Sequence, residues 1–470
     1  MKAQNAPLII FTTLVFIWNG ALLSYFPCGS VAVPWLLLAL AAGIAFLCYK
    51  SVGYCSRTGL YILTAAWMML ATGYILNLNY FTVHDGGTLF APVLHNFDAS
   101  TSWIRMLEVL NGTAPGDLRM LGYGQLLALL TLGMPPRLDV LLAFNVLATM
   151  VTVILTGAVT AYLQTGTDEE KKRSSAWAML LMVCVCYFMA SGCILIKDAV
   201  MCLAMAGVLF SLARLKTFNK SYGSYIILIA STLLAALVRP LLLPFIMMAV
   251  IMMTAVSQRN RIMPAIILVL ACAALFAYTR STGTAAEVIN IHGTTSMELE
   301  TGAAQRLEAY RTVSPEYNSL SFGSKLIRLP FSLCVQFLTP LPWAFGRDVV
   351  FGPTQAYAHI AYPWYAVGGL ALFFLFFMLR KAPRGIAVVF TFGVIATVIT
   401  AFFTGGTISR YCLVWLSALV PGAALVIVSG RWRTKQFACW AVIFAILVAA
   451  ALCVTFHFLN IYSPGGWEAV

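Results

Sequence analysis

The sequence predicts an all-α, polytopic membrane protein, and three observations support this fold class. Hydrophobic residues make up 61% of the 470 residues and charged residues only 10%, whereas roughly 25% of a soluble chain is charged. The apolar residues gather in runs of the length that crosses a bilayer, about 20 residues. Two long segments, 79–137 and 280–357, interrupt these runs and carry most of the acidic residues. We therefore expect a transmembrane helix bundle with two large outer loops.

Thirteen runs are candidate spans, which divide the chain into four parts. Residues 1–58 form an N-terminal pair of helices, 59–279 a core with the first outer loop, 280–357 the second outer loop, and 358–470 the C-terminal helices. Two of the shorter runs, 199–215 and 222–238, leave open a broken or re-entrant helix. The runs lie at 8–27, 32–49, 59–78, 138–163, 176–193, 199–215, 222–238, 241–257, 262–279, 358–379, 386–403, 411–429 and 437–460.

Both outer loops contain apolar stretches that favour helices lying along the membrane surface. In the first loop these stretches are 102–110 and 121–134. In the second loop, Lys325–Phe345 is apolar but interrupted by three prolines. Prolines remove backbone donors that lipid cannot replace. We expect this segment to be interfacial or re-entrant.

The basic residues predict which side each loop faces. Cytoplasmic loops are enriched in Lys and Arg, and the rule applies to short loops. With the N-terminus inside, the short inner segments hold 17 of the 29 basic residues: Lys2, Lys50, Arg57, Lys171, Lys172, Arg173, Arg214, Lys216, Lys220, Arg259, Arg261, Arg380, Lys381, Arg384, Arg431, Arg433 and Lys435. The odd span count then puts the C-terminus and both long loops outside. Short loops and no eukaryotic targeting signal favour a bacterial inner (plasma) membrane.

Composition also argues against two kinds of role: nucleic-acid binding, and cysteines that form disulfides or bind metal. The net charge of +13 is split into short clusters between apolar runs, without the basic stripe that nucleic-acid binding requires, so we expect no nucleic-acid partner. Nearly all of the 12 cysteines lie inside apolar runs, where they are typical of packing residues and not of disulfides or metal ligands.

Charged residues at the outer ends of the spans are the candidate functional groups, because a charge held there needs a partner or a function. His84 and Asp85 follow the third span and precede two glycines. A carboxylate in this position can take a proton from a hydroxyl or bind a cation. The alternative is a turn in which Asp85 caps the next segment.

Three further outer positions carry charge. Lys197 and Asp198 lie in a very short loop, which places the pair at the outer surface, although Asp198 also suits the start of the following helix. Arg239 stands before Pro240 between two apolar runs, and its planar guanidinium suits a phosphate, a headgroup or Asp198. Arg410 follows a glycine-rich turn whose amides could help to hold a phosphate.

The order of these features resembles the GT-C superfamily of membrane glycosyltransferases, which includes protein O-mannosyltransferases and aminoarabinose transferases. The resemblance spans about residues 59–429. It rests on the segments YFTVHDGGTLFAP (80–92), LGYGQLLALLTLGMP (121–135), EEKKRSS (169–175), LIKDAVMCLAM (195–205) and ISRYCLVWLSALVPGAAL (408–425). It implies that Asp85 is the catalytic carboxylate, that Asp198 is the second acidic position, and that Arg410 lies near the donor phosphate.

The resemblance further implies an inverting transfer of a hexose or pentose at the outer face. The donor would be a lipid-linked sugar, a polyprenyl phosphate, and the acceptor a glycan, lipid or protein. Asp85 would be the general base. Arg239 or Arg410, together with Lys197 beside Asp198 and His84 beside Asp85, would bind donor or substrate. A divalent cation, Mg²⁺ or Mn²⁺, stays open, since only one reliable ligand is visible; no other cofactor is expected.

Other functions compete with this interpretation. A polymerase or ligase of lipid-linked polysaccharide, such as an O-antigen polymerase, would use LVRPLLLP (237–244) and TISRY (407–411) equally well. A transporter or flippase would require charges at the bilayer midplane, whereas these charges lie at the outer rim. A receptor or scaffold would leave the rim charges unexplained.

Overall fold

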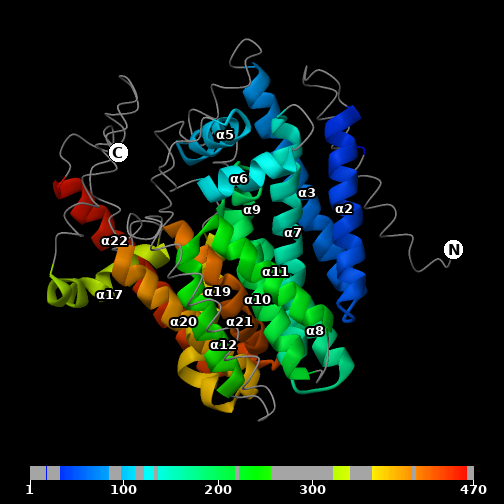
Figure 1. Ribbon diagram of the computed structural model, residues 1–470. Coiled ribbons are helices and arrows are strands. Elements are labelled where there is room, and N and C mark those ends of the chain that lie inside the picture. The colour runs from blue at the N-terminus through cyan, green and yellow to red at the C-terminus, as the bar shows by residue number, and fades with distance from the viewer. Residues whose placement is uncertain are drawn as a thin grey trace.

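The computed structural model describes residue 17 and residues 32–83, 97–112, 121–131, 136–217, 222–255, 321–338, 362–404 and 409–462. Within these ranges the chain consists of helices joined by short links, and it contains no strand (Figure 1). The predicted all-α class is therefore confirmed for the described residues. The predicted spans 8–27, apart from residue 17, and 262–279 lie outside them, as does most of the second outer loop.

The helices follow the predicted spans closely in several places. The predicted spans 138–163 and 222–238 are helices α7 and α11 with the same bounds. The elements are α2 Ala32–Ser51, α3 Arg57–Val83, α5 Phe97–Leu110, α6 Leu121–Leu130, α7 Leu138–Leu163, α8 Asp168–Cys184, α9 Cys186–Ser191, α10 Asp198–Thr217, α11 Tyr222–Val238, η2 Pro240–Leu242, α12 Leu243–Ala255, α17 Phe322–Leu338, α19 Tyr362–Phe373, η5 Phe374–Met378, η6 Leu379–Lys381, α20 Arg384–Thr404, η7 Ser409–Trp415, α21 Leu416–Val428, η8 Arg431–Arg433 and α22 Lys435–Tyr462.

Seven helical segments in the described part of the chain are long and apolar enough to cross a membrane, so the membrane class follows. Three shorter apolar helices, at 222–238, 240–254 and 412–428, accompany them. The count of thirteen spans stays a prediction. The segment 198–217 is one continuous helix of 20 residues, so it is not half of a broken span.

The predicted span 176–193 is interrupted. Helix α8 starts at Asp168, well before the apolar run, because Thr167 and Glu170 form a capping box: the amide of Glu170 donates to Thr167 and the amide of Thr167 donates to Glu170. The helix ends at Val185, whose backbone leaves the helical region, and the short helix α9 follows. The break brings residues 192–197 back into the bundle.

Helix α7 is the centre of the bundle and is largely buried along its length. Its neighbours include α8 and α10, and Gly157 lets α8 approach, since a Cβ there would lie 2.7 Å from Met179 and 2.8 Å from the Ser175 hydroxyl. Four buried threonines donate their hydroxyl protons to the carbonyl four residues earlier: Thr149, Thr152, Thr156 and Thr160. Their polar groups are thereby satisfied without water.

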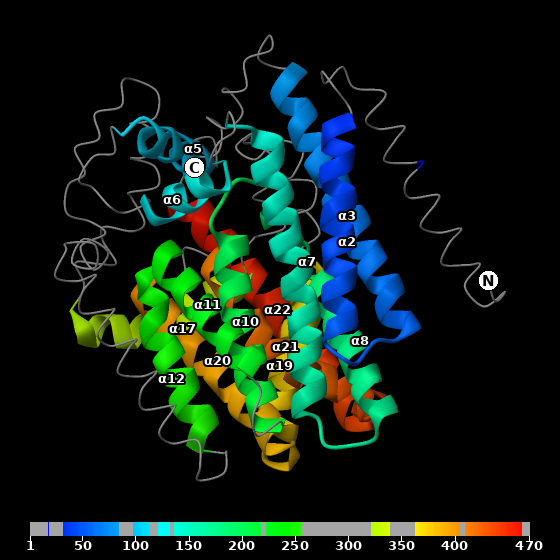
Figure 2. The ribbon, with the colours of Figure 1, turned by 45° about the vertical axis from the view of Figure 1, so that its right-hand side comes forward.

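The links between helices lie at two opposite ends of the bundle. Figures 1 and 2 show the turn 164–167, the link 382–383 and η8 at one end, with α5 and α6 at the other. The basic residues in and beside these links, Lys171, Lys172, Arg173, Arg380, Lys381, Arg384, Arg431 and Arg433, therefore share one end of the bundle. Which side of the membrane this end faces stays a prediction. We call the end that carries α5 and α6 the loop end.

Helix α17 covers the first part of the predicted segment Lys325–Phe345, and the residues after Leu338 lie outside the described ranges. Proline 330 is inside the helix. Ser332 and Gln336 are buried toward the neighbouring helices, whereas Ile327 and Phe331 are exposed. The exposed side of α17 therefore carries mainly large apolar residues, with Arg328 among them, as expected of a helix at a membrane interface.

Candidate functional site

The predicted site residues differ in how far the structure describes them. Lys197, Asp198 and Arg239 are described with their side chains. Arg410 lies in the 3-10 helix η7, and only its backbone is described. His84 and Asp85 lie outside the described residues, so their placement stays a prediction.

Asp198 is the first residue of α10, and only 1% of its surface is exposed. Asp198 is therefore not exposed, and it takes the alternative position expected from the sequence, at the start of the following helix. The reason is tertiary: the chain between α9 and α10 folds inward and α6 packs above it. A carboxylate buried in an apolar bundle is costly, and such positions in membrane proteins are usually functional.

The segment 192–197 before Asp198 is shaped by close packing. A Cβ on Gly192 would lie 2.4 Å from the Thr149 hydroxyl and 2.9 Å from Leu70, so only glycine lets the chain pass between α7 and α3. The amide of Ile196 donates to the carbonyl of Ile194 at 2.8 Å. Helix α10 then begins with the amide of Met201 donating to Lys197 at 2.9 Å, which fixes Asp198 in its first turn.

Two residues that the sequence reasoning missed surround this segment. Asn145 on α7 is 0% exposed, and its side-chain amide donates to the carbonyls of Ile194 at 2.6 Å and Ile196 at 3.2 Å. The hydroxyl of Tyr123 on α6 donates to Oδ1 of Asn145 at 3.3 Å. A lone amide inside an apolar run was the available signal for Asn145; the sequence offered none as clear for Tyr123.

The pKa of the Tyr123 hydroxyl shows that Asp198 is close by. Burial raises the pKa of the Tyr123 hydroxyl, its hydrogen bond to Asn145 lowers it, and the nearby carboxylate of Asp198 raises it further. The three side chains of Tyr123, Asn145 and Asp198 therefore form one buried polar cluster, which we call the Asp198 cluster. It lies at the loop end of the bundle, under α6.

Helix α6 connects this cluster to Arg239. Gly122 packs against the carbonyl of Leu237, two residues before Arg239, because a Cβ on Gly122 would lie 1.7 Å from that oxygen. Pro240 forces an extended backbone on Arg239, with φ −158° and ψ 95°, so α11 ends at the loop end. Arg239 and Asp198 thus flank the same short helix.

Helix α5 supports α6 from the other side. Gly124 on α6 lies against the backbone of Arg105 and Met106, where a Cβ would be 3.0–3.2 Å from their atoms. Arg105 is buried and forms an ion pair with Glu108, Nη1 to Oε2, at 2.8 Å. This pair adds a buried arginine at the loop end, which the sequence did not predict.

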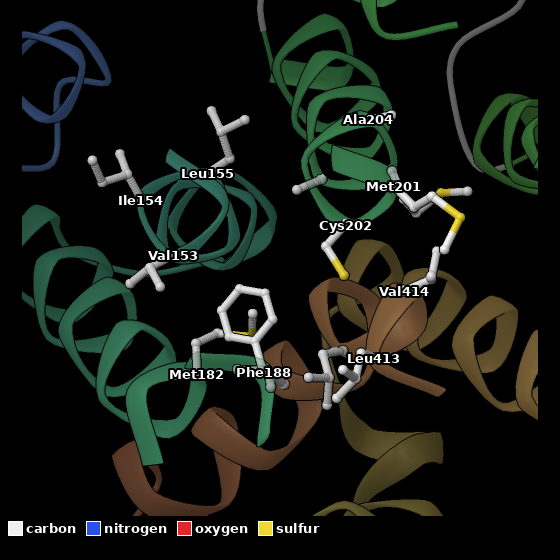
Figure 3. Packing of buried hydrophobic residues seen from close by; sticks show 14 of the residues in the cluster. Val153, Ile154, Leu155, Met182, Phe188, Met201, Cys202, Ala204, Leu413 and Val414 are labelled. Carbon is white, nitrogen blue, oxygen red and sulfur yellow. The ribbon is translucent and has the colours of Figure 1, made fainter. Parts of the chain in front are cut away.

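The 3-10 helix η7 carries Arg410 against α10. Figure 3 shows Met201 and Cys202 of α10 facing Leu413 and Val414 of η7. Cys202 is one turn from Asp198 and interacts electrostatically with it and with Cys412. The backbone of Arg410, two residues from Cys412, therefore lies beside the first turns of α10.

A further charged pair lies at the start of α7. Arg137 bonds both carboxylate oxygens of Asp139, with Nε to Oδ1 at 3.0 Å, and Tyr74 donates to the backbone carbonyl of Asp139 at 3.1 Å. The hydrogen bond and charge of Asp139 raise the pKa of Arg137. This pair anchors the helix start to α3 and is structural.

The described residues hold no group of three or more His, Cys, Asp or Glu side chains placed to bind a metal ion. The divalent cation stays a prediction that depends on residues such as Asp85.

Comparisons of the chain with protein-family models, curated proteins and solved structures found no match. The GT-C resemblance accordingly rests on the sequence segments 80–92, 121–135, 169–175, 195–205 and 408–425.

Proposed function

We propose that this chain is a membrane glycosyltransferase that moves a sugar from a polyprenyl-phosphate donor to an acceptor at the outer face of the plasma membrane. The observation that carries the proposal is the burial of Asp198 at the loop end, under α6 and beside the helix that carries Arg410. A buried carboxylate beside segments that bear isolated arginines suits a substrate with both hydroxyl and phosphate groups.

The reaction follows from these groups. The acceptor hydroxyl attacks C1 of the sugar, the bond from C1 to the phosphate oxygen breaks, and the anomeric configuration inverts. Asp85 takes the proton of the acceptor hydroxyl as general base. The electron pair goes to the lipid phosphate, where Arg410 or Arg239 stabilises the added negative charge.

In this proposal Asp198 is the second acidic group, held in a dry part of the bundle. Low dielectric strengthens its interaction with a sugar hydroxyl, a cation or an arginine compared with the same contact in water. Arg239 lies beyond α6 from Asp198. The cluster could therefore meet the sugar while the arginine meets the phosphate.

The positions of the charges favour an enzyme over a carrier. In the described membrane-spanning helices, the Asp, Glu, Lys and Arg residues lie in or near the first and last turns: Arg57, Asp139, Asp198, Arg214, Arg384 and Lys435 are examples. A transporter would place ionisable groups near the middle of the bilayer. The buried middle of α7 instead carries threonines whose hydroxyls bond to backbone carbonyls of their own helix.

The test is an assay of sugar transfer in proteoliposomes that contain the purified full chain and a panel of polyprenyl-phosphate hexoses and pentoses. Asp85→Asn, Arg239→Ala and Arg410→Ala are compared with Asp168→Asn, which removes an exposed carboxylate from the opposite end. Loss of transfer in Asp85→Asn and Arg410→Ala supports the transferase. Full activity in Asp85→Asn removes the carboxylate base, and losses in the arginine variants alone favour a polymerase or ligase.

A further inference from the structure

Asn145 makes three hydrogen bonds to two separate parts of the chain. Its side-chain nitrogen holds the carbonyls of Ile194 and Ile196, and its side-chain oxygen accepts from Tyr123. The residue is fully buried, so water cannot replace any of these bonds. Asn145 therefore joins α7, the segment before Asp198, and α6 at one point.

The two carbonyls explain why an amide is needed at this position. Residues 194 and 196 lie outside the regular helices, so their carbonyls lack the amide four residues later that a helix supplies. The carbonyl of Ile194 accepts the amide of Ile196 and has a second lone pair for Asn145. Two donors on one nitrogen meet both carbonyls, and the remaining oxygen is left to accept one proton. Asparagine supplies this set of donors and acceptor, whereas a carboxylate would face the two carbonyls with no proton to donate.

We propose that Asn145 is a positioning residue that fixes the direction of Asp198, and that Tyr123 transmits the docking of α6 to it. Asp198 begins the helix that directly follows Ile194 and Ile196, so a shift of either carbonyl turns the first turn of α10. Tyr123 is on α6, which packs against the carbonyl of Leu237 through Gly122. If α6 moves away, Oδ1 of Asn145 loses the hydrogen bond from the Tyr123 hydroxyl. The effect on catalysis rests on the proposed function. The coupling of Tyr123 and Asn145 to the segment before Asp198 does not depend on it.

The chain offers variants that separate these roles. Asn145→Asp keeps the size and the acceptor for Tyr123, but it loses both donors when ionised and one of the two when burial keeps it protonated, so at least one carbonyl loses its partner. Tyr123→Phe keeps the buried ring and loses only the hydroxyl. Thr160→Val is the matched control, because Thr160 is equally buried at the far end of α7 and its hydroxyl bonds to the carbonyl of Thr156 in its own helix.

The first measurement is amide hydrogen exchange by mass spectrometry on the full chain in lipid nanodiscs. We expect exchange in residues 192–201 to rise by about tenfold or more in Asn145→Asp and by a smaller factor in Tyr123→Phe, since each lost buried bond frees the segment to open. Thr160→Val leaves this segment unchanged. Unaltered exchange in both Asn145→Asp and Tyr123→Phe overturns the proposal, whatever the chain catalyses.

The second measurement applies the sugar-transfer assay to the same variants. A positioning role predicts a lower kcat with the KM for the lipid donor nearly unchanged, and a smaller loss in Tyr123→Phe than in Asn145→Asp. Equal losses in Thr160→Val would mean general destabilisation and contradict the role. If the wild type transfers no sugar, the proposed function fails while the exchange result still decides the coupling.

Discussion

Gly122 on α6 lies directly against the carbonyl oxygen of Leu237 at the end of α11, and a Cβ there would be 1.7 Å from that oxygen. This contact seats α6 on the bundle between Arg239 and the Asp198 cluster. The contact requires glycine at position 122, because any larger residue would push the backbones of α6 and α11 apart.

Gly122→Ala is therefore expected to destabilise the loop end, by about 1–3 kcal/mol, because the obstructing atom is backbone and cannot rotate away. The measurement is the thermal unfolding midpoint of the detergent-solubilised chain. Gly43→Ala is the control: Gly43 lies inside α2 with open space around it, and alanine there is expected to raise stability by about 0.5–1 kcal/mol. Equal effects at the two positions would contradict the seating of α6.

The hydroxyl of Thr156 on α7 lies 2.9 Å from that of Ser417 on α21, and both residues are buried. Thr156→Val and Ser417→Ala should show a coupling energy of about 0.6 kcal/mol, at most about 1.7, as for polar pairs between membrane helices. A double-mutant cycle on unfolding free energy measures it. Thr152→Val with Ser417→Ala is the control, because the Thr152 hydroxyl bonds to Ala148. A coupling in the control as large as in the test pair would contradict the α7–α21 bond.

Tyr123 predicts an effect of high pH on stability. Burial and the nearby Asp198 raise the pKa of its hydroxyl above the unfolded value of about 10, so the folded state keeps the proton longer than the unfolded state. The contribution of this shift to the free energy of unfolding is complete below about pH 10. It is lost as pH rises further, by at most about 1.4 kcal/mol per pH unit.

The comparison is between wild type and Tyr123→Phe, which has no proton to lose. The wild type is expected to lose stability more steeply between about pH 9.5 and 11, so the difference between the two chains narrows. Unfolding midpoints across this range measure the trend. A difference that is constant with pH would show that Tyr123 ionises as it does in water.

Arg384 lies in the first turn of α20, close enough to Lys216 of α10 for the two charges to repel. A cation is unfavourable at a helix N-terminus, where acidic residues are preferred. Arg384→Glu should therefore stabilise the chain by roughly 0.5–1 kcal/mol in low salt, and less in high salt because Arg384 is exposed.

Lys435→Glu is the matched control for this change. Lys435 is also exposed and lies in the first turn of α22. Its substitution by Glu therefore brings the same stabilisation by the helix dipole and the same change in charge as Arg384→Glu. The excess effect of Arg384→Glu measures the contact with Lys216. Equal shifts in unfolding midpoint would show that Lys216 contributes nothing.

Several helix bounds agree closely with the predicted apolar runs, because these bounds depend on local hydrophobicity. Helices α7 and α11 have the predicted bounds, and α10 begins one residue before its predicted start. The start of α8 at Asp168 was missed, since its capping box lies in a charged segment outside the apolar run. The break at Val185 was missed as well, because the apolar pattern continues through it.

The site was predicted only in part, for a physical reason. Asp198 and Arg239 could be found from their charge at the ends of apolar runs, and both lie at the loop end. The burial of Asp198 depends on α6 packing above residues 192–197, and no local pattern encodes that contact. Asn145 and Tyr123 are joined only by the fold, so their bond could not be read from their spacing.

The central claim is that the buried carboxylate of Asp198 belongs to a site for lipid-linked sugars. The most direct test is the rate of sugar transfer from polyprenyl-phosphate donors by Asp198→Asn in proteoliposomes, relative to wild type and to Asp168→Asn. We expect Asp198→Asn to lose about a hundredfold or more in rate, as for a group that stabilises the transition state, while Asp168→Asn retains wild-type activity. Wild-type transfer by a folded Asp198→Asn protein would contradict the account.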